Sequence, residues 1–159
     1  MAKLPLARRR KVPRVPVLIV EDNADQWLII RSALSQCFPE VEPVWVNNAD
    51  QAIRYLEIQA TGTDKLPWLI IADLYLPSRE DGWRLLEFHK SHTFYRKPPV
   101  IILSASKDKE DIIKVYSYSV ASYIVKPISY HEWLSSFYAF RRYWWELVML
   151  PARDQPSTH

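Results

Sequence analysis

The chain has 159 residues, 48% of them hydrophobic and 25% charged, which suits one compact domain with a substantial core and leaves no room for a second. Its apolar runs fall far short of the roughly 20 residues that cross a bilayer, and no secretory signal pattern opens it, so we expect a cytoplasmic protein without a membrane partner. The formal net charge of +3 misleads, because six basic residues lie within the first fourteen positions and the remaining chain carries a net charge of −3.

Residues 1–14 hold prolines and basic residues but no acidic or aromatic residue, so we expect a disordered, solvated basic arm rather than a nucleic-acid-binding segment. Residues 15–149 carry the pattern of a folded domain, and residues 150–159 read as a polar tail. No nucleic-acid partner is therefore expected.

Short β-branched runs alternate with amphipathic stretches from residue 15 onward, which predicts an α/β fold with a parallel sheet. In chain order we expect a strand at 15–20, a helix to about 36, a strand at 41–46, a helix ending near 62, a strand at 68–73, a helix at about 83–91, a strand at 100–104, a shorter helix, a strand at 121–125 and a long helix to about 149. Four residue pairs indicate helix starts: Asn23 with Gln26, Asn48 with Gln51, Asp108 with Asp111, and Ser129 with Glu132.

Polar residues stand at the carboxyl ends of four predicted strands, where open parallel sheets bind their ligands. The first strand ends at Glu21 and Asp22, the third at Asp73, the fourth at Ser104 and the fifth at Lys126. Each residue alone has an ordinary explanation at a helix end or on the surface, but the strand order of such folds brings all of them together. Carboxylates suit Mg²⁺, while a lysine and a hydroxyl suit the oxygens of a phosphoryl group. The sequence thus predicts a phosphoryl-transfer site.

Five short motifs resemble those of the receiver domain of two-component response regulators. They are Val-Leu-Ile-Val-Glu-Asp-Asn at 17–23, Ile-Ala-Asp-Leu-Tyr-Leu-Pro at 71–77, Asp81-Gly82, Ile-Ile-Leu-Ser-Ala-Ser at 101–106 and Tyr-Ile-Val-Lys-Pro at 123–127. The resemblance implies a flavodoxin-like, doubly wound sheet of five parallel strands in the order 2-1-3-4-5, with five helices. Departures are a slightly longer loop after Pro77, the bulky Tyr75, and Val120 where glycine is frequent.

The resemblance also implies roles for the strand-end residues. Asp73 would be the phosphorylated residue and Asp22 a direct ligand of Mg²⁺, with Mn²⁺ as an alternative metal. Glu21 would act on the metal through water, and the main-chain carbonyl of Tyr75 would complete the ligand set.

Further roles concern the phosphoryl group and the switch. Ser104, Ala105 and Lys126 would bind the phosphoryl group, and Ser104 would move toward it. Tyr123 would then turn inward, so Ser104 and Tyr123 form the expected switch. The peptide bond between Lys126 and Pro127 would be cis.

We expect no output domain after the receiver, and therefore no transcription factor unless another chain supplies the DNA-binding part. The chain resembles stand-alone regulators that partner phytochrome-type or hybrid histidine kinases. The implied phosphodonor is a histidine kinase, a hybrid kinase or a phosphotransfer protein. The chain is then a switch that catalyses only its own phosphorylation and dephosphorylation, and is not an enzyme in the ordinary sense.

The last predicted helix is rich in aromatic residues. Helical spacing places four of them in the core: Trp133, Phe137, Phe140 and Trp144. Three others are expected on a homodimer face formed by the fourth helix, fifth strand and last helix: Tyr138, Tyr143 and Trp145. Cys37 reads as a core thiol, and the histidines, without metal-site spacing, are expected at the surface: His89, His92, His131 and His159.

Three other classes compete with this interpretation. A haloacid-dehalogenase-type phosphatase would need a second aspartate two residues after Asp73, where Tyr75 stands. A flavodoxin-like cofactor carrier would need a phosphate-binding loop after the first strand, and Gly occurs only twice in the chain. A pseudo-receiver, acting only as an interaction module, would keep the fold and lose the acids that are present here.

Overall fold

The computed structural model describes residues 13–62 and 66–150, so nearly all of the predicted arm and tail lies outside the described residues. Its centre is a sheet of five parallel strands in the order β2-β1-β3-β4-β5. The strands are β1 (Val15–Val20), β2 (Val41–Val46), β3 (Leu69–Ala72), β4 (Val100–Ser104) and β5 (Ser122–Val125). The helices are α1 (Ala24–Cys37), α2 (Ala49–Thr61), α3 (Arg79–Lys90), α4 (Lys109–Ser117), α5 (Tyr130–Arg141) and the π-helix η1 (Arg142–Leu147). The predicted doubly wound fold is confirmed.

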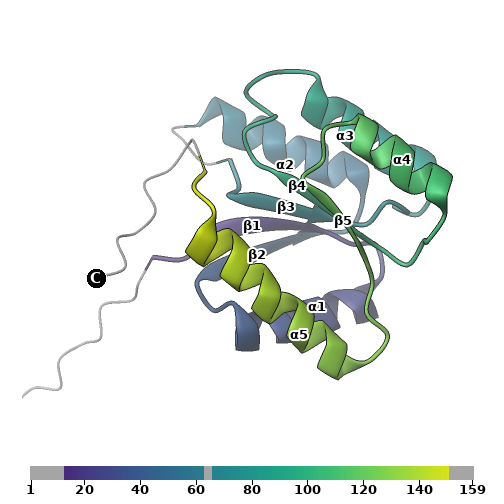
Figure 1. Ribbon diagram of the computed structural model, residues 1–159. Helices are drawn as coiled ribbons and strands as arrows, with labels where there is room; N and C mark the ends of the chain where they lie inside the picture. The colour runs from purple at the N-terminus through teal and green to yellow at the C-terminus, as the bar shows by residue number, and fades with distance from the viewer. Residues whose placement is uncertain (1–12, 63–65, 151–159) are drawn as a thin grey trace, which may run out of the picture.

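Helices α1 and α5 cover one face of the sheet, and α2, α3 and α4 cover the other (Figure 1). Side chains alternate between the two faces of a strand. Val17 and Ile19 of β1 accordingly pack with α1 and α5, whereas Leu18 and Val20 pack in the second core. Because both faces are covered, strands can be apolar throughout, and β3 and β4 are buried at every residue.

Three of the four predicted helix starts form as expected. The side chains of Asn23, Asn48 and Ser129 each accept a hydrogen bond from the backbone amide three residues later, which stabilises α1, α2 and α5. Helix α4 differs, because Asp108 accepts from the Glu110 amide. Asp111, expected to complete that cap, is buried instead.

Helix α3 begins at Arg79, earlier than the predicted start near Trp83. Glycine is a poor helix former, so Gly82 made this segment resemble a loop. In the structure Gly82 lies inside α3, where an added Cβ would stand 1.9 Å from the main-chain oxygen of Leu74. The glycine therefore permits a close approach between α3 and the loop that follows β3.

His89 is buried, so its predicted surface position is wrong. It continues the buried row of α3 formed by Gly82, Leu85 and Leu86, at helical spacing. Its Nε2 lies 2.7 Å from the Pro98 carbonyl oxygen, and burial lowers the pKa of the imidazole. The apolar face of α3 thus extends one turn further than the sequence suggested.

The aromatic C-terminus forms the predicted core, and two of the three aromatic residues predicted on a dimer face, Tyr138 and Tyr143, are exposed. The four predicted core aromatics are buried: Trp133, Phe137, Phe140 and Trp144. Trp145, expected on the outside, instead packs edge-on against Phe38 and Trp68, with centroids 6.0 and 5.5 Å away. The π-helix η1 has a wider turn than an α-helix, and this directs Trp145 back to the core. Tyr138 is exposed and lies beside Cys37 of α1.

The predicted cis bond between Lys126 and Pro127 is wrong. Within residues 13–62 and 66–150, the cis peptide bond joins Leu76 and Pro77. A trans bond is the intrinsic preference before proline. With this bond trans, the Lys126 side chain still reaches its carboxylate partners.

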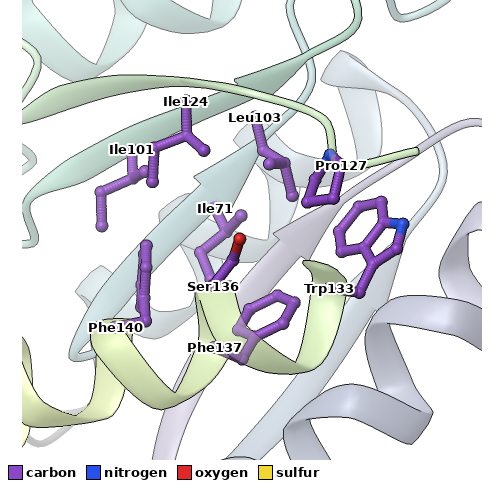
Figure 2. Close-up of a pocket in the computed structure, with 9 residues that line it drawn as sticks. All are labelled: Ile71, Ile101, Leu103, Ile124, Pro127, Trp133, Ser136, Phe137 and Phe140. Carbon is purple, nitrogen blue, oxygen red and sulfur yellow. The ribbon is translucent and has the colours of Figure 1, made fainter. Parts of the chain in front are cut away.

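An apolar pocket lies between α5 and the sheet (Figure 2). Its lining residues are Ile71, Ile101, Leu103, Ile124, Pro127, Trp133, Ser136, Phe137 and Phe140. None of these nine side chains ionises, so this pocket offers no carboxylate for a metal ion and no cation for a phosphoryl group. Separately, no helix in the described part of the chain is long and apolar enough to span a bilayer.

Candidate functional site

The sheet ladder itself places the predicted site residues. The amide of Glu21 donates to Val46, and the amide of Asp73 donates to Val20. In the same way, the amide of Lys126 donates to the carbonyl of Ser104. Each bond extends the parallel pairing by one residue, so the side chains that follow β1, β3 and β5 emerge at one edge of the sheet.

Three carboxylates gather at this edge. Glu21, Asp22 and Asp73 each offer one oxygen, and these oxygens all lie within 4.8 Å of one another. Glu21 and Asp73 are buried, with 2% and 9% of their surface exposed, whereas Asp22 faces solvent. The cluster is thus closed by protein on one side and open to water on the other.

Lys126 neutralises part of this charge. Its Nζ lies 2.8 Å from Glu21 Oε2 and 2.8 Å from Asp73 Oδ2. Burial alone would lower the pKa of Lys126, but the facing carboxylates of Asp73 and Glu21 outweigh it and raise that pKa. Burial is the largest influence on Glu21 and, together with the neighbouring charge of Asp73, raises the pKa of its carboxyl group despite the contact with Lys126. Within the described part of the chain, the site therefore contains two buried carboxylates, Glu21 and Asp73, but only one ammonium group, that of Lys126, in contact with them.

The donor set fits a divalent cation that prefers oxygen. Mg²⁺ uses carboxylates and a carbonyl while keeping several waters, and the exposed side of Asp22 leaves room for them. A cation there would offset the burial that disfavours ionised Glu21. Asp73 Oδ1 accepts from the Tyr75 amide at 3.2 Å, which holds the backbone of the predicted carbonyl ligand next to the acid.

Both predicted switch residues contact Ser106, in the loop that follows β4. Ser104 is fully buried, and its Oγ accepts from the Ser106 amide at 3.3 Å. Tyr123 is partly buried, and its hydroxyl donates to the Ser106 carbonyl at 2.7 Å. Ala105 is exposed and lines an open groove with Lys126. Ser106, which the sequence did not assign, thus links both predicted switch residues.

A second group missed at the level of sequence surrounds Asp111. Its buried carboxylate accepts hydrogen bonds from the Tyr75 hydroxyl, the Ser106 hydroxyl and the Arg79 guanidinium, each at 3.0 Å. The guanidinium of Arg79 also lies over the Tyr75 ring. Burial, followed by the contact with Asp111, raises the pKa of Tyr75, so its hydroxyl stays a donor. An acid in the first turn of a helix gives no sequence signal for such a role.

Comparison with known proteins identifies similar chains. A family model for the response regulator receiver domain matches residues 17–137, which include the acidic cluster and Lys126. The Probable methanogenesis regulatory protein FilR2 of Methanothrix harundinacea is 30% identical over 128 residues, covering 80% of this chain and 82% of FilR2.

Solved structures agree with the sequence matches. The crystal structure of the phosphorylated cyanobacterial phytochrome response regulator RcpA superposes with a TM-score of 0.76 at 30% identity, covering 87% of this chain and 99% of RcpA. The Mn²⁺-bound form of response regulator Rcp1 superposes with a TM-score of 0.74 at 25% identity, over 87% of this chain and 99% of Rcp1.

Proposed function

Because this chain belongs to the response regulator receiver family, we propose that it accepts a phosphoryl group from a histidine kinase on Asp73 and acts as a signalling switch. The observation that carries the proposal is the joint placement of three carboxylates within 4.8 Å and of Lys126 between two of them. The phosphorylated RcpA and the Mn²⁺-bound Rcp1 support phosphate and a divalent metal as ligands of such a site. A phytochrome-type or hybrid kinase is the proposed donor class.

The proposed reaction is an exchange of one bond for another. An oxygen of Asp73 attacks phosphorus, the P–N bond to the donor histidine breaks, and an acyl phosphate forms as the histidine gains a proton. Mg²⁺ held by Asp22, Asp73 and the Tyr75 carbonyl, with Glu21 acting through water, would supply positive charge to the phosphoryl oxygens. Lys126 contributes a second cation, since it already contacts Asp73.

The buried Ser104 provides the response to the new group. Its hydroxyl would turn to the phosphoryl oxygens, with the Ala105 amide beside it, and leave the Ser106 amide that it now accepts from. Tyr123 contacts the same Ser106, so the change would reach β5 and α4. We propose a phosphoacceptor whose only catalysis is of its own phosphorylation and dephosphorylation.

Incubation with acetyl phosphate and Mg²⁺ tests this function by intact-protein mass. The native chain is expected to gain one phosphoryl mass, and neither a chelator-treated sample nor Asp73→Asn should gain it. Asp25→Asn, an exposed acid in the first turn of α1, is the matched control and should react like the native chain. If neither acetyl phosphate nor a panel of phosphorylated kinases modifies Asp73, the pseudo-receiver alternative is favoured.

We also propose homodimerisation through the face formed by α4, β5 and α5. Exposed apolar side chains of α4, of β5 and of η1, which continues α5, support this: Ile113, Tyr116, Val125 and Tyr143. Phosphorylated protein is expected to sediment as a dimer, and Tyr116→Ser should weaken the association by about tenfold in Kd. A monomer at high concentration, with and without phosphorylation, would exclude this interface.

A further inference from the structure

The two loops that border the acidic cluster meet at one buried carboxylate. Tyr75, in the loop after β3, donates its hydroxyl to Asp111 Oδ2, and Ser106, in the loop after β4, donates its hydroxyl to the same oxygen. Both distances are 3.0 Å. Asp111 belongs to the first turn of α4, so the carboxylate connects this helix to both loops.

The other contacts of these residues lead directly to the phosphoryl site. The Tyr75 amide donates to Asp73 Oδ1, and the Ser106 amide donates to Ser104 Oγ. A continuous set of hydrogen bonds therefore runs from the acceptor through Tyr75 to Asp111, and back through Ser106 to the predicted switch hydroxyl. Arg79 donates to the remaining oxygen of Asp111, whose side chain is only 3% exposed.

We propose that Asp111 is a positioning residue for the phosphoryl site, which couples occupancy of Asp73 by a phosphoryl group to the position of helix α4. The inference rests on the proposed phosphoacceptor function. Asp111 belongs to neither the metal-binding nor the phosphoryl-binding residues, and it connects the site to α4.

Burial explains why this connection is stiff. A buried carboxylate needs its donors, because water cannot replace them when a donor leaves. If a phosphoryl group draws the Ala105 amide toward Asp73, the adjoining Ser106 must either carry Asp111 with it or leave that carboxylate short of one hydrogen bond. If Asp111 moves with Ser106, helix α4 moves too, since Asp111 lies on its first turn. A buried charge keeps its hydrogen bonds strongly, which favours this movement over the loss of a hydrogen bond.

Hydrogen–deuterium exchange of full-length protein tests the coupling, with and without acetyl phosphate and Mg²⁺. Intact mass confirms in each sample that Asp73 carries a phosphoryl group. In the native chain, phosphorylation is expected to change the exchange rates of amides in the first turn of α4 by about tenfold. Asp111→Ala should still be phosphorylated but lose this response, changing by less than about twofold. Alanine is the best helix former, so α4 itself is preserved.

Glu110→Ala is the matched control. Glu110 is exposed in the same turn and also contributes a negative charge to the helix N-terminus, so this variant should respond like the native chain. If Asp111→Ala fails to fold, Tyr75→Phe and Ser106→Ala each remove one donor, and both should reduce the response.

The outcomes separate the two proposals. A native chain that takes no phosphoryl group from acetyl phosphate or a kinase would overturn both. Phosphorylated Asp111→Ala, or the pair Tyr75→Phe and Ser106→Ala, with the full native response in α4 would overturn the role of Asp111 and leave the phosphoacceptor function intact.

Discussion

Gly82→Ala is expected to lower the free energy of unfolding by about 3 kcal/mol, the upper end of what overpacking of a close contact costs. The added Cβ would stand 1.9 Å from the Leu74 oxygen, 2.8 Å from its carbonyl carbon and 3.0 Å from its Cδ1. Two of these atoms belong to the backbone, so a side-chain rotation cannot relieve the contact. Alanine would otherwise favour the helix by about 1 kcal/mol, which is too little to offset the clash.

Under the proposed function the same substitution should impair phosphorylation, because Leu74 lies between the proposed acceptor Asp73 and Tyr75. If α3 moves away from this loop, it would displace Asp73 and Tyr75, which flank Leu74 and belong to the proposed metal site. Urea denaturation measures the stability, and the rate of adduct formation with acetyl phosphate measures the function.

Gly62→Ala serves as the control for glycine replacement. Its nearest neighbour would be the Gln59 oxygen at 3.9 Å, and its φ of −92° suits any residue. Its stability should change by less than about 0.5 kcal/mol. Equal free energies of unfolding for Gly82→Ala and Gly62→Ala would show that α3 does not pack closely against the loop after β3.

The grouping of the site residues could be predicted from sequence because a parallel sheet has a simple rule for its strand ends. Glu21, Asp73 and Lys126 each follow a strand, and adjacent parallel strands bring such residues to one edge. The helix caps at Asn23 and Asn48 were equally predictable, since capping depends on residues only three positions apart.

Tertiary packing decided what the sequence did not show. From sequence, Asp111 resembles an ordinary acidic residue in the first turn of a helix. It becomes a buried hydrogen-bond acceptor only because two loops meet at its carboxylate. Trp145 was misplaced because no local pattern signals the π-helix that turns it inward. Gly82 resembled a helix breaker, whereas close packing against Leu74 explains its presence inside α3.

Lys126→Met is the second prediction with a large effect. The ammonium of Lys126 lies 2.8 Å from both Glu21 and Asp73, and methionine keeps the unbranched apolar stem of the side chain but lacks the ammonium group. Loss of this cation from the phosphoryl site should slow phosphorylation of Asp73 about a hundredfold, as for the removal of other groups that stabilise a transition-state charge. The time course of adduct formation with acetyl phosphate measures the rate.

Stability should also become dependent on metal. Without Mg²⁺, the substitution leaves two buried carboxylates with no cation, which costs about 3 kcal/mol or more when one partner of a buried pair is removed. Under the proposed function Mg²⁺ would bind this carboxylate cluster in the folded state only, so it should restore most of the loss. Thermal unfolding with and without Mg²⁺ distinguishes the two conditions.

Lys107→Met tests whether any nearby positive charge would serve. Lys107 lines the same groove as Lys126 and is exposed. Its replacement should leave both the rate and the metal dependence close to native, because exposed charges are screened by water and salt. A native phosphorylation rate in Lys126→Met would mean that the metal alone neutralises the phosphoryl oxygens, and that Lys126 serves only to hold Glu21 and Asp73 together before the metal binds.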